Sequence, residues 1–300
     1  MKKHSCILLL LAAILFIAIP SSAQKTPGKL PDLLLRVDDI GMNHAVNTAA
    51  QQLAESGIPF STSVMFACPW YQEAVSILKN HPHVTVGVHL TLNAEWRNYR
   101  WGPVTGREAV PSLVDSDGYF LPSIEAFLQS NYKLEEVEKE LTAQVERALS
   151  SGLKITYLDP HMGMAIATPE LRAIVEKLAQ KYRLAISTYF GEDYKSMWSV
   201  PVAVKKQEFM LHVNNLKAGK TNLVELHIAH ATPEMDVLVD MNSSLMNTAE
   251  GTPQASQHRK TELEMLLSPE FRTLIGKKFN LVTYSDLARV PGISAMKRPI

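Results

Sequence analysis

The chain has 300 residues, and 30 lysines and arginines balance 30 aspartates and glutamates, so its formal net charge is zero. No basic tract is longer than two or three residues, which gives no support to nucleic-acid binding. The two cysteines are Cys6 and Cys68. If an N-terminal leader carrying Cys6 is removed, no internal disulfide can form, and stability must come from a core that the 46% of hydrophobic residues can supply.

The first segment of the chain, residues 1–23, is typical of a secretory signal. Lys2 and Lys3 precede an apolar run over residues 7–19, and the small residues 21–23 suit cleavage. That run is shorter than the roughly 20 residues of a membrane span, so we expect no stable membrane insertion after cleavage. We therefore expect an exported protein, periplasmic or extracellular, with an uncleaved anchor as the alternative.

Beyond residue 23, short apolar runs alternate with helical patterns. Asn43 is a suitable N-cap for a first helix, which presents Val46 and Leu53 on one face and ends at Gly57. Further helical periodicity covers residues 70–80, 134–149 and 171–178. The apolar runs predict strands at residues 33–37, 60–66, 84–90, 155–158, 184–188, 209–213, 223–229 and 280–284. Residues 93–125 and 232–258 are interpreted as irregular.

Repeated strand–helix alternation indicates parallel strands joined by crossover helices. Over this length it favours an α/β fold, a distorted TIM-like (β/α) barrel with seven or eight parallel strands. A doubly wound open sheet is the alternative.

Polar side chains follow several of the predicted strands. Asp38 and Asp39 follow the first strand, His89 ends the third, and Asp159 and His161 follow the fourth. Each alone also fits a turn, a cap or a structural role. Because the carboxyl ends of parallel strands share one face of the fold, we expect these side chains to converge. One aspartate with two histidines suits Zn²⁺ or another divalent first-row ion, and Mg²⁺ less naturally, while the second aspartate of the pair accepts a proton.

Two histidines near the end of the 223–229 strand compete for the role of general acid. On a strand, His230 shares a face with Leu226, whereas His227 shares the other face with Glu225. We prefer His230 because it lies at the strand end, and keep His227 as the fallback. Asp159 is expected to orient a histidine, either His161 or His230.

Three segments resemble motifs of one known family. Residues 37–43 (VDDIGMN) resemble the Asp-Asp-Phe-Gly opening of the YdjC/ChbG-like carbohydrate deacetylases. Residues 87–92 (GVHLTL) and 156–163 (TYLDPHMG) are similar to the family's second and third motifs, and residues 268–271 and 280–284 fit its C-terminal region. The resemblance covers about residues 31–288.

The resemblance implies a barrel-like fold and the hydrolytic removal of acetyl groups from N-acetylated sugars, with residues 24–300 as a single catalytic domain. It implies Asp39, His89 and His161 as metal ligands and Asp38 as the base. The family's acid histidine corresponds less closely to His230, because Ala231 follows where many members have proline. The family's aromatic residue is replaced by Ile40, Tyr157 stands where many members have histidine, and Gly163 where some have a further histidine, which leaves the sugar preference open.

The segment after the His89 strand is rich in aromatic and basic residues. Trp96, Tyr99 and Trp101 are candidates for stacking on sugar rings, and Arg97 and Arg100 for hydrogen bonds to the sugar. The alternative is a loop that packs these aromatics onto the barrel rim. Arg259 is a further candidate for substrate contact, with pairing to an acid on a helix as its alternative.

Two other function classes remain open on the sequence. One is a non-catalytic carbohydrate-binding protein on the same fold, which the presence of a base beside a metal set disfavours. The other is a metal hydrolase acting on a different bond, such as a phosphate ester, although no glycine-rich phosphate cradle is present. A homodimer is compatible with the sequence.

Overall fold

The computed structural model describes residues 29–243 and 254–299, and the predicted signal at residues 1–23 lies outside this part. The strands of the described part form one sheet of parallel pairs. They are β1 (Asp32–Ile40), β2 (Ser61–Val64), β3 (Thr85–Leu90), β4 (Ile155–Pro160), β5 (Ala185–Ile186), β6 (Asp193–Ser196), β7 (Thr221–His227) and β8 (Asn280–Val282). No helix of the described part is long and apolar enough to cross a membrane.

The strand order identifies an incompletely closed barrel. It runs β5-β4-β3-β2-β1-β7-β6, with β8 pairing the start of β1. The strands thus follow chain order around a circle, and among the described strands no pairing joins β5 to β6. A doubly wound sheet would instead reverse its order beside the first strand. The prediction of a distorted barrel of parallel strands is confirmed, as a curled half-barrel.

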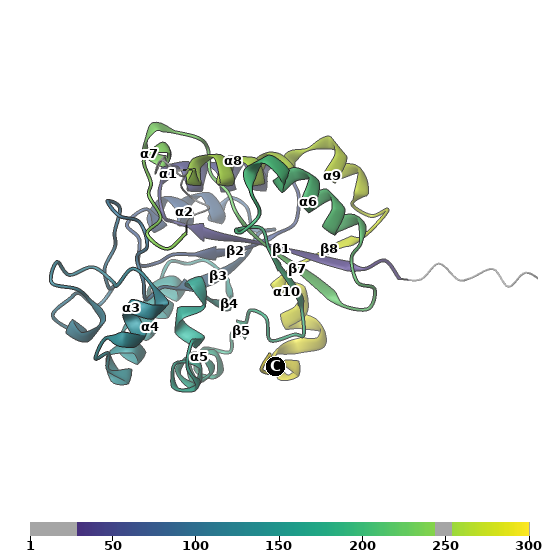
Figure 1. The fold of residues 1–300 in the computed structure, drawn as a ribbon. Helices are drawn as coiled ribbons and strands as arrows, with labels where there is room; N and C mark the ends of the chain where they lie inside the picture. Colours follow the sequence, from purple (N-terminus) through teal and green to yellow (C-terminus); the bar gives the residue numbers. More distant parts are fainter. Residues whose placement is uncertain (1–28, 244–253, 300) are drawn as a thin grey trace, which may run out of the picture.

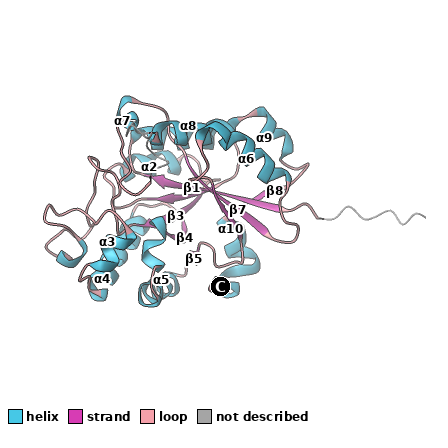
Figure 2. Ribbon diagram, in the orientation of Figure 1, coloured by secondary structure: helices cyan, strands magenta, loops and turns pink. Residues whose placement is uncertain are grey.

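Helices connect the strands and cover the outside of the curl (Figures 1 and 2). They are α1 (His44–Glu55), α2 (Tyr71–Lys79), α3 (Ile124–Gln129), α4 (Leu134–Ser150), α5 (Pro169–Tyr182), α6 (Val202–Asn214), α7 (Pro233–Asp236), α8 (Ala255–Leu267), α9 (Pro269–Leu274) and α10 (Tyr284–Leu287). Asn43 caps α1 as predicted, since its side chain accepts a hydrogen bond from the Val46 N–H. Such a cap stabilises a helix by about 1 kcal/mol.

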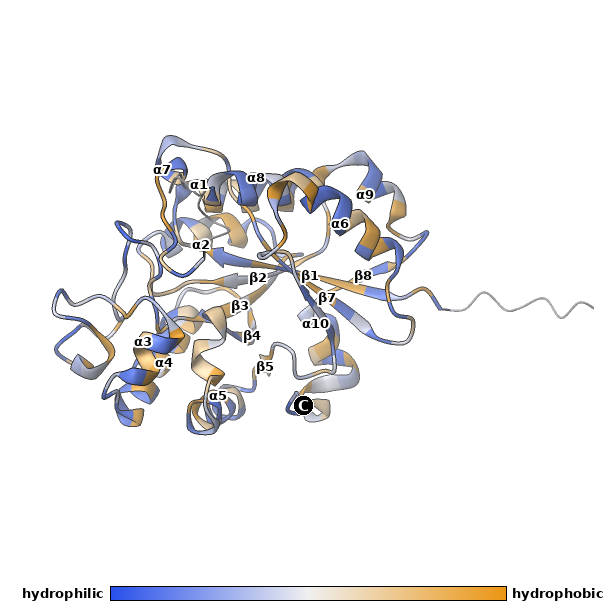
Figure 3. Ribbon diagram, in the orientation of Figure 1, coloured by the Kyte–Doolittle hydropathy of each residue, from blue (hydrophilic) through white to orange (hydrophobic). Residues whose placement is uncertain are grey.

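Alternation along β1 divides the interior into two clusters. Leu33, Leu35 and Val37 face the helices in the main core, where apolar helix faces cover the strands (Figure 3). Leu34 faces the inside of the curl and packs with Tyr157 and three other strand or helix residues, Ala185, Leu223 and Tyr284. This apolar plug fills the amino-terminal end of the barrel, so the open space lies at the carboxyl ends of the strands.

Tyr157 occupies its place in the plug because Gly87 leaves room for it. A Cβ atom at Gly87 would lie 2.5 Å from the Tyr157 ring. The tyrosine hydroxyl reaches the Ser63 hydroxyl at 3.0 Å, so the polar end of the ring is satisfied although it is buried. Tyr157 therefore has a structural role beneath the site.

The structure differs from the prediction in three regions. Residues 209–213, predicted as a strand, belong to α6, because a short apolar run does not distinguish a strand from the buried face of a helix. The strand β6 (Asp193–Ser196) has no apolar pattern and was not predicted; it lies at the open edge of the sheet. The region 232–258, predicted as loop, contains α7 and the start of α8, and residues 244–253 lie outside the described part.

Candidate metal centre and active site

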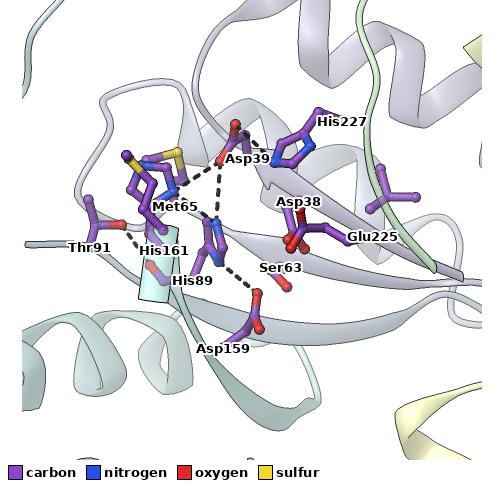
Figure 4. Close-up of polar contacts among 12 residues, drawn as sticks. Asp38, Asp39, Ser63, Met65, His89, Thr91, Asp159, His161, Glu225 and His227 are labelled. Carbon is purple, nitrogen blue, oxygen red and sulfur yellow. Dashed lines mark hydrogen bonds and ion pairs between the residues drawn. The ribbon is translucent and has the colours of Figure 1, made fainter. Parts of the chain in front are cut away.

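The carboxyl ends of β1, β3, β4 and β7 surround a cavity of about 420 Å³. Its lining brings together side chains far apart in the sequence, including Asp38, Asp39, His89, His161, Glu225 and His227. Figure 4 shows these side chains converging above the strands. The predicted convergence of the aspartate pair with both histidines is therefore present in the fold.

Both aspartates reach this cavity because the backbone departs from a regular strand at Asp39. Neighbouring strand residues normally point to opposite faces. Asp39 has a φ of +67°, and the pairing of β1 with β2 is irregular between Val37 and Ile40. A left-handed conformation at a residue other than glycine is uncommon and often marks a functional site. The irregularity allows Asp38 and Asp39 to serve the same cavity.

Asp39, His89 and His161 form a cluster with the spacing of metal ligands. Asp39 Oδ1 lies 3.3 Å from His89 Nε2 and 3.3 Å from His161 Nδ1, and the two nitrogens are 3.0 Å apart. Ligand atoms about 2.1 Å from one cation are separated by about 3.0–3.4 Å in octahedral or tetrahedral geometry. Asp39 Oδ1 is buried and has no hydrogen-bond partner in the described part of the chain. The three residues therefore fit a divalent cation.

Each of the three side chains has a charged neighbour on its other side. His89 Nδ1 lies 2.9 Å from Asp159, and His161 Nε2 lies 3.1 Å from Glu95. Asp39 Oδ2 accepts a hydrogen bond of 2.5 Å from Arg259. Such partners fix the ring orientation and the tautomer of metal-binding histidines. Asp159 thus orients His89, which corrects the prediction of His161 or His230, and Glu95 holds His161.

The electrostatics of the cluster favour a positive charge between its members. Burial alone would lower the pKa of His161, but Glu95 and Asp39 raise it to about 9. Burial alone would raise the pKa of Asp39, but Arg259 and the two histidines hold it well below its usual value. A cation bound by His161 would take the place of this proton, because a histidine binds metal in its neutral form.

Asp38 lies outside the cluster and is bound by Arg36. The Arg36 guanidinium lies 2.8 Å from Asp38, 2.8 Å from Asp159 and 2.7 Å from Glu225. Burial raises the pKa of Asp38 to about 7 against the opposing effect of Arg36. Arg36 and Glu225 were not singled out in the sequence, although strand alternation puts Arg36 on the same face as Asp38 and Glu225 on that of His227.

His227, and not His230, lines the cavity. His227 pairs in register with Asp38 across β1 and β7, and its Nε2 lies 4.0 Å from Asp39. His230 lies beyond the end of β7, where its backbone N–H donates to Ala45, and it is not among the residues lining the cavity. The preference for His230 is therefore corrected in favour of the fallback. Burial lowers the pKa of His227 to about 4.

The structure assigns different roles to the predicted sugar-binding residues. Trp96 and Trp101 are buried, and Trp101 Nε1 donates to a backbone carbonyl, so neither ring is available for stacking. Arg100 pairs with the carboxylate of Asp115 at 2.6 Å. Arg97 is exposed and lies in neither of the two cavities at this end of the barrel. The alternative interpretation, packing onto the barrel rim, is the one that fits both tryptophans.

Tyr99 and Arg259, the other two candidates for substrate contact, lie in different surroundings from the tryptophans. Tyr99 remains partly accessible at a second cavity. Arg259, on α8, is buried with its guanidinium near the rings of Trp96 and Trp198 and bonded to Asp39. Its partner is therefore an acid, as the alternative held, but one on β1 and not on a helix. Arg259 acts on Asp39 and does not reach the cavity.

Comparison with known proteins agrees with this architecture. A carbohydrate deacetylase of Brevibacillus brevis is 29% identical over 260 residues, which cover 85% of this chain and 99% of that protein. A carbohydrate deacetylase of Thermoanaerobacter pseudethanolicus is 30% identical over 215 residues, covering 68% and 83%. A solved structure of an Enterococcus faecalis protein named for cellobiose-phosphate cleavage shares the fold, with a TM-score of 0.67, 23% identity, and coverage of 86% and 99%. Residues 32–277 match the family model described as YdjC-like protein, and the chain belongs to this family.

Proposed function

We propose that this protein is a metal-dependent hydrolase that removes acetyl groups from N-acetylated sugars. The observation that carries the proposal is the Asp39–His89–His161 cluster, which lies beside Asp38 and His227 in one cavity. A cavity of about 420 Å³ is of the size that holds small-molecule ligands. The relatives named carbohydrate deacetylase support the choice of an acetylated sugar as the substrate.

The cluster residues would hold the cation, which is Zn²⁺ or Mg²⁺. When bound, such an ion supplies a Lewis acid that polarises a carbonyl and lowers the pKa of water. Asp38 is not one of the three cluster residues. Burial raises its pKa to about 7, which suits a general base near neutral pH. We therefore assign it the proton that water loses as it attacks the acetyl carbonyl.

His227 is the candidate for returning a proton to the departing nitrogen. It offers a nitrogen within 4.8 Å of a carboxylate oxygen of Asp38. Because burial lowers its pKa, His227 is neutral at pH 7 and must receive a proton before it can donate one. In our proposal the proton taken up by Asp38 reaches the amine through His227 as the C–N bond breaks. Each positioned proton-transfer group is worth about 10²–10⁴-fold in rate.

The test is acetate release from N-acetylglucosamine and its oligomers by protein freed of metal with a chelator and then resupplied with single divalent ions. We expect release that depends on the added ion. Asp38→Asn should lose about 10²–10⁴-fold in kcat and still bind metal, whereas His161→Ala should lose metal on elemental analysis. His212→Ala is the matched control, because His212 lies on α6 and outside this cavity.

Two results would contradict the proposal. One is acetate release by Asp38→Asn at the wild-type rate, which removes the base. The other is full metal occupancy in His161→Ala, which removes the ligand assignment. Release of phosphate from sugar phosphates, with no acetate from any N-acetylated sugar, would favour a metal hydrolase that acts on phosphate esters.

A further inference from the structure

A second cavity of about 530 Å³ lies where the start of α1, the start of α2 and the short helix α7 come together (Figure 1). We call it the Trp70 hollow. Aromatic and apolar side chains form much of its lining, among them His44, Trp70, Tyr99, Val237 and Leu238. None of the metal-cluster residues lines it, so it is distinct from the catalytic cavity.

The largest aromatic ring exposed in the hollow is that of Trp70, which is 43% accessible. Trp70 precedes α2 and makes no side-chain capping bond, so its indole is not used to stabilise the helix. His44 lies beside it, with ring centroids 5.6 Å apart, and is held by a 2.7 Å contact with Glu73. A large aromatic ring exposed in a concave site is typical of a surface that binds a ligand.

A second aromatic ring is fixed in orientation. The Tyr99 hydroxyl donates to the backbone carbonyl of Met42, so the ring rather than the hydroxyl is left for contact. Leu238 is buried beneath the hollow, and Val237 is exposed at it. The hollow therefore offers apolar surface beside an aromatic ring whose hydroxyl is already bonded.

Polar groups suited to hydroxyl ligands border these rings. The Asn98 amide and the Glu234 carboxylate are exposed at the hollow, and neither has a hydrogen bond or ion pair within residues 29–243 and 254–299. An amide both donates and accepts, and a carboxylate accepts, which matches a row of sugar hydroxyls. A pyranose ring needs two kinds of contact: an aromatic face against its C–H side and polar groups for its hydroxyls.

The hollow and the catalytic cavity share the same three chain segments. The first runs from Asp39 to Ala45, the second from Glu95 to Tyr99, and the third from Thr232 to Asp240. In each segment one end lines the catalytic cavity and the other end lines the hollow. The backbone bonds Arg97 N–H to Val239 and Met241 N–H to Glu95 tie the second and third segments together. The catalytic cavity and the hollow therefore lie at opposite ends of the same three segments.

From these observations we infer that the Trp70 hollow is a second carbohydrate-binding site, which holds a sugar unit linked to the acetylated unit in the catalytic cavity. The inference rests on the proposed function for the identity of the first unit. It assigns the aromatic contact to Trp70 and Tyr99, in place of the buried Trp96 and Trp101. It also predicts a preference for oligosaccharides over a single N-acetylated sugar.

The experiment compares kcat/KM for acetate release from N-acetylglucosamine and from its trimer in wild type and three variants. Trp70→Ala should reduce the ratio of trimer to monomer kcat/KM about tenfold, the effect of losing one aromatic contact of about 1.4 kcal/mol. Trp70→Phe should restore most of the ratio. Leu211→Ala removes an exposed apolar side chain from α6, away from both cavities, and should leave the ratio unchanged.

Calorimetric binding of the trimer separates this inference from the proposed function. If no acetate is released by any form, binding that weakens about tenfold in Trp70→Ala still supports the site. Binding that is equal in wild type and Trp70→Ala, or no binding to wild type, overturns it. An unchanged trimer-to-monomer ratio in an active Trp70→Ala overturns it as well.

Discussion

Replacement of Arg36 by methionine tests the charge balance on which the proposed base depends. The guanidinium, 6% exposed, lies within 2.8 Å of three carboxylates, those of Asp38, Asp159 and Glu225. Removing one partner of a buried ion pair costs about 3–5 kcal/mol, because the remaining charge has neither water nor a counter-ion. For a chain of this size each kcal/mol corresponds to about 2–4 °C, so we expect the Tm to fall by roughly 10 °C.

The pH dependence of the stability lost in Arg36→Met identifies the cause of that loss. Burial opposes the ionised form of Asp159, and Arg36 is the first of the groups that hold its pKa below the usual value. Without Arg36, burial dominates, and the folded-state pKa values of these carboxyls rise above the unfolded values of about 4. A group with a raised folded pKa takes up its proton more readily when folded, so the deficit in stability should shrink as the pH falls from 8 to 5.

The assay is urea unfolding of chelated protein at pH 8 and pH 5. Arg147→Met is the matched control, because Arg147 bonds a backbone carbonyl and has no carboxylate partner among the described residues. It should lose about 1 kcal/mol at both pH values. Wild-type stability of Arg36→Met at pH 8, or a deficit that is equal at the two pH values, would refute the reasoning.

Three further substitutions test how the site is held and which histidine serves it. Asp159→Asn should weaken metal binding about 10–100-fold, because Asp159 fixes the His89 ring; competition with a chelator measures this, and unchanged affinity would contradict it. His227→Ala should lower kcat about 10²–10⁴-fold, whereas His230→Ala should remain near wild type, as judged by acetate release. A larger loss of kcat in His230→Ala than in His227→Ala would instead assign the general acid to His230.

The half-barrel could be predicted because its strands are locally encoded. The run Leu33–Leu35 makes β1 recognisable as a buried strand, and the helices between the strands carry apolar residues at helical spacing, so β1 and α1 were located from the sequence. The strand β6 carries no such signal, because it lies at the open edge and is held by its register with β7. The α6 segment was assigned wrongly because its apolar run is too short to show a period.

The sequence by itself determined which strand ends carry the aspartates and histidines, and therefore that Asp38, Asp39, His89 and His161 would converge. This follows from topology alone, since parallel strands direct their carboxyl ends to one face.

Only the tertiary structure decided how the roles are divided among these four residues and their neighbours. The left-handed backbone at Asp39 allows two adjacent carboxylates to serve one cavity, and no periodic pattern records such an irregularity. The register of β7 on β1 places His227 opposite Asp38 and leaves His230 beyond the strand. Burial, a property of the whole packed chain, removed Trp96 and Trp101 from the sugar-binding candidates and left Trp70 exposed, because the surface that covers a ring comes from segments distant in the sequence.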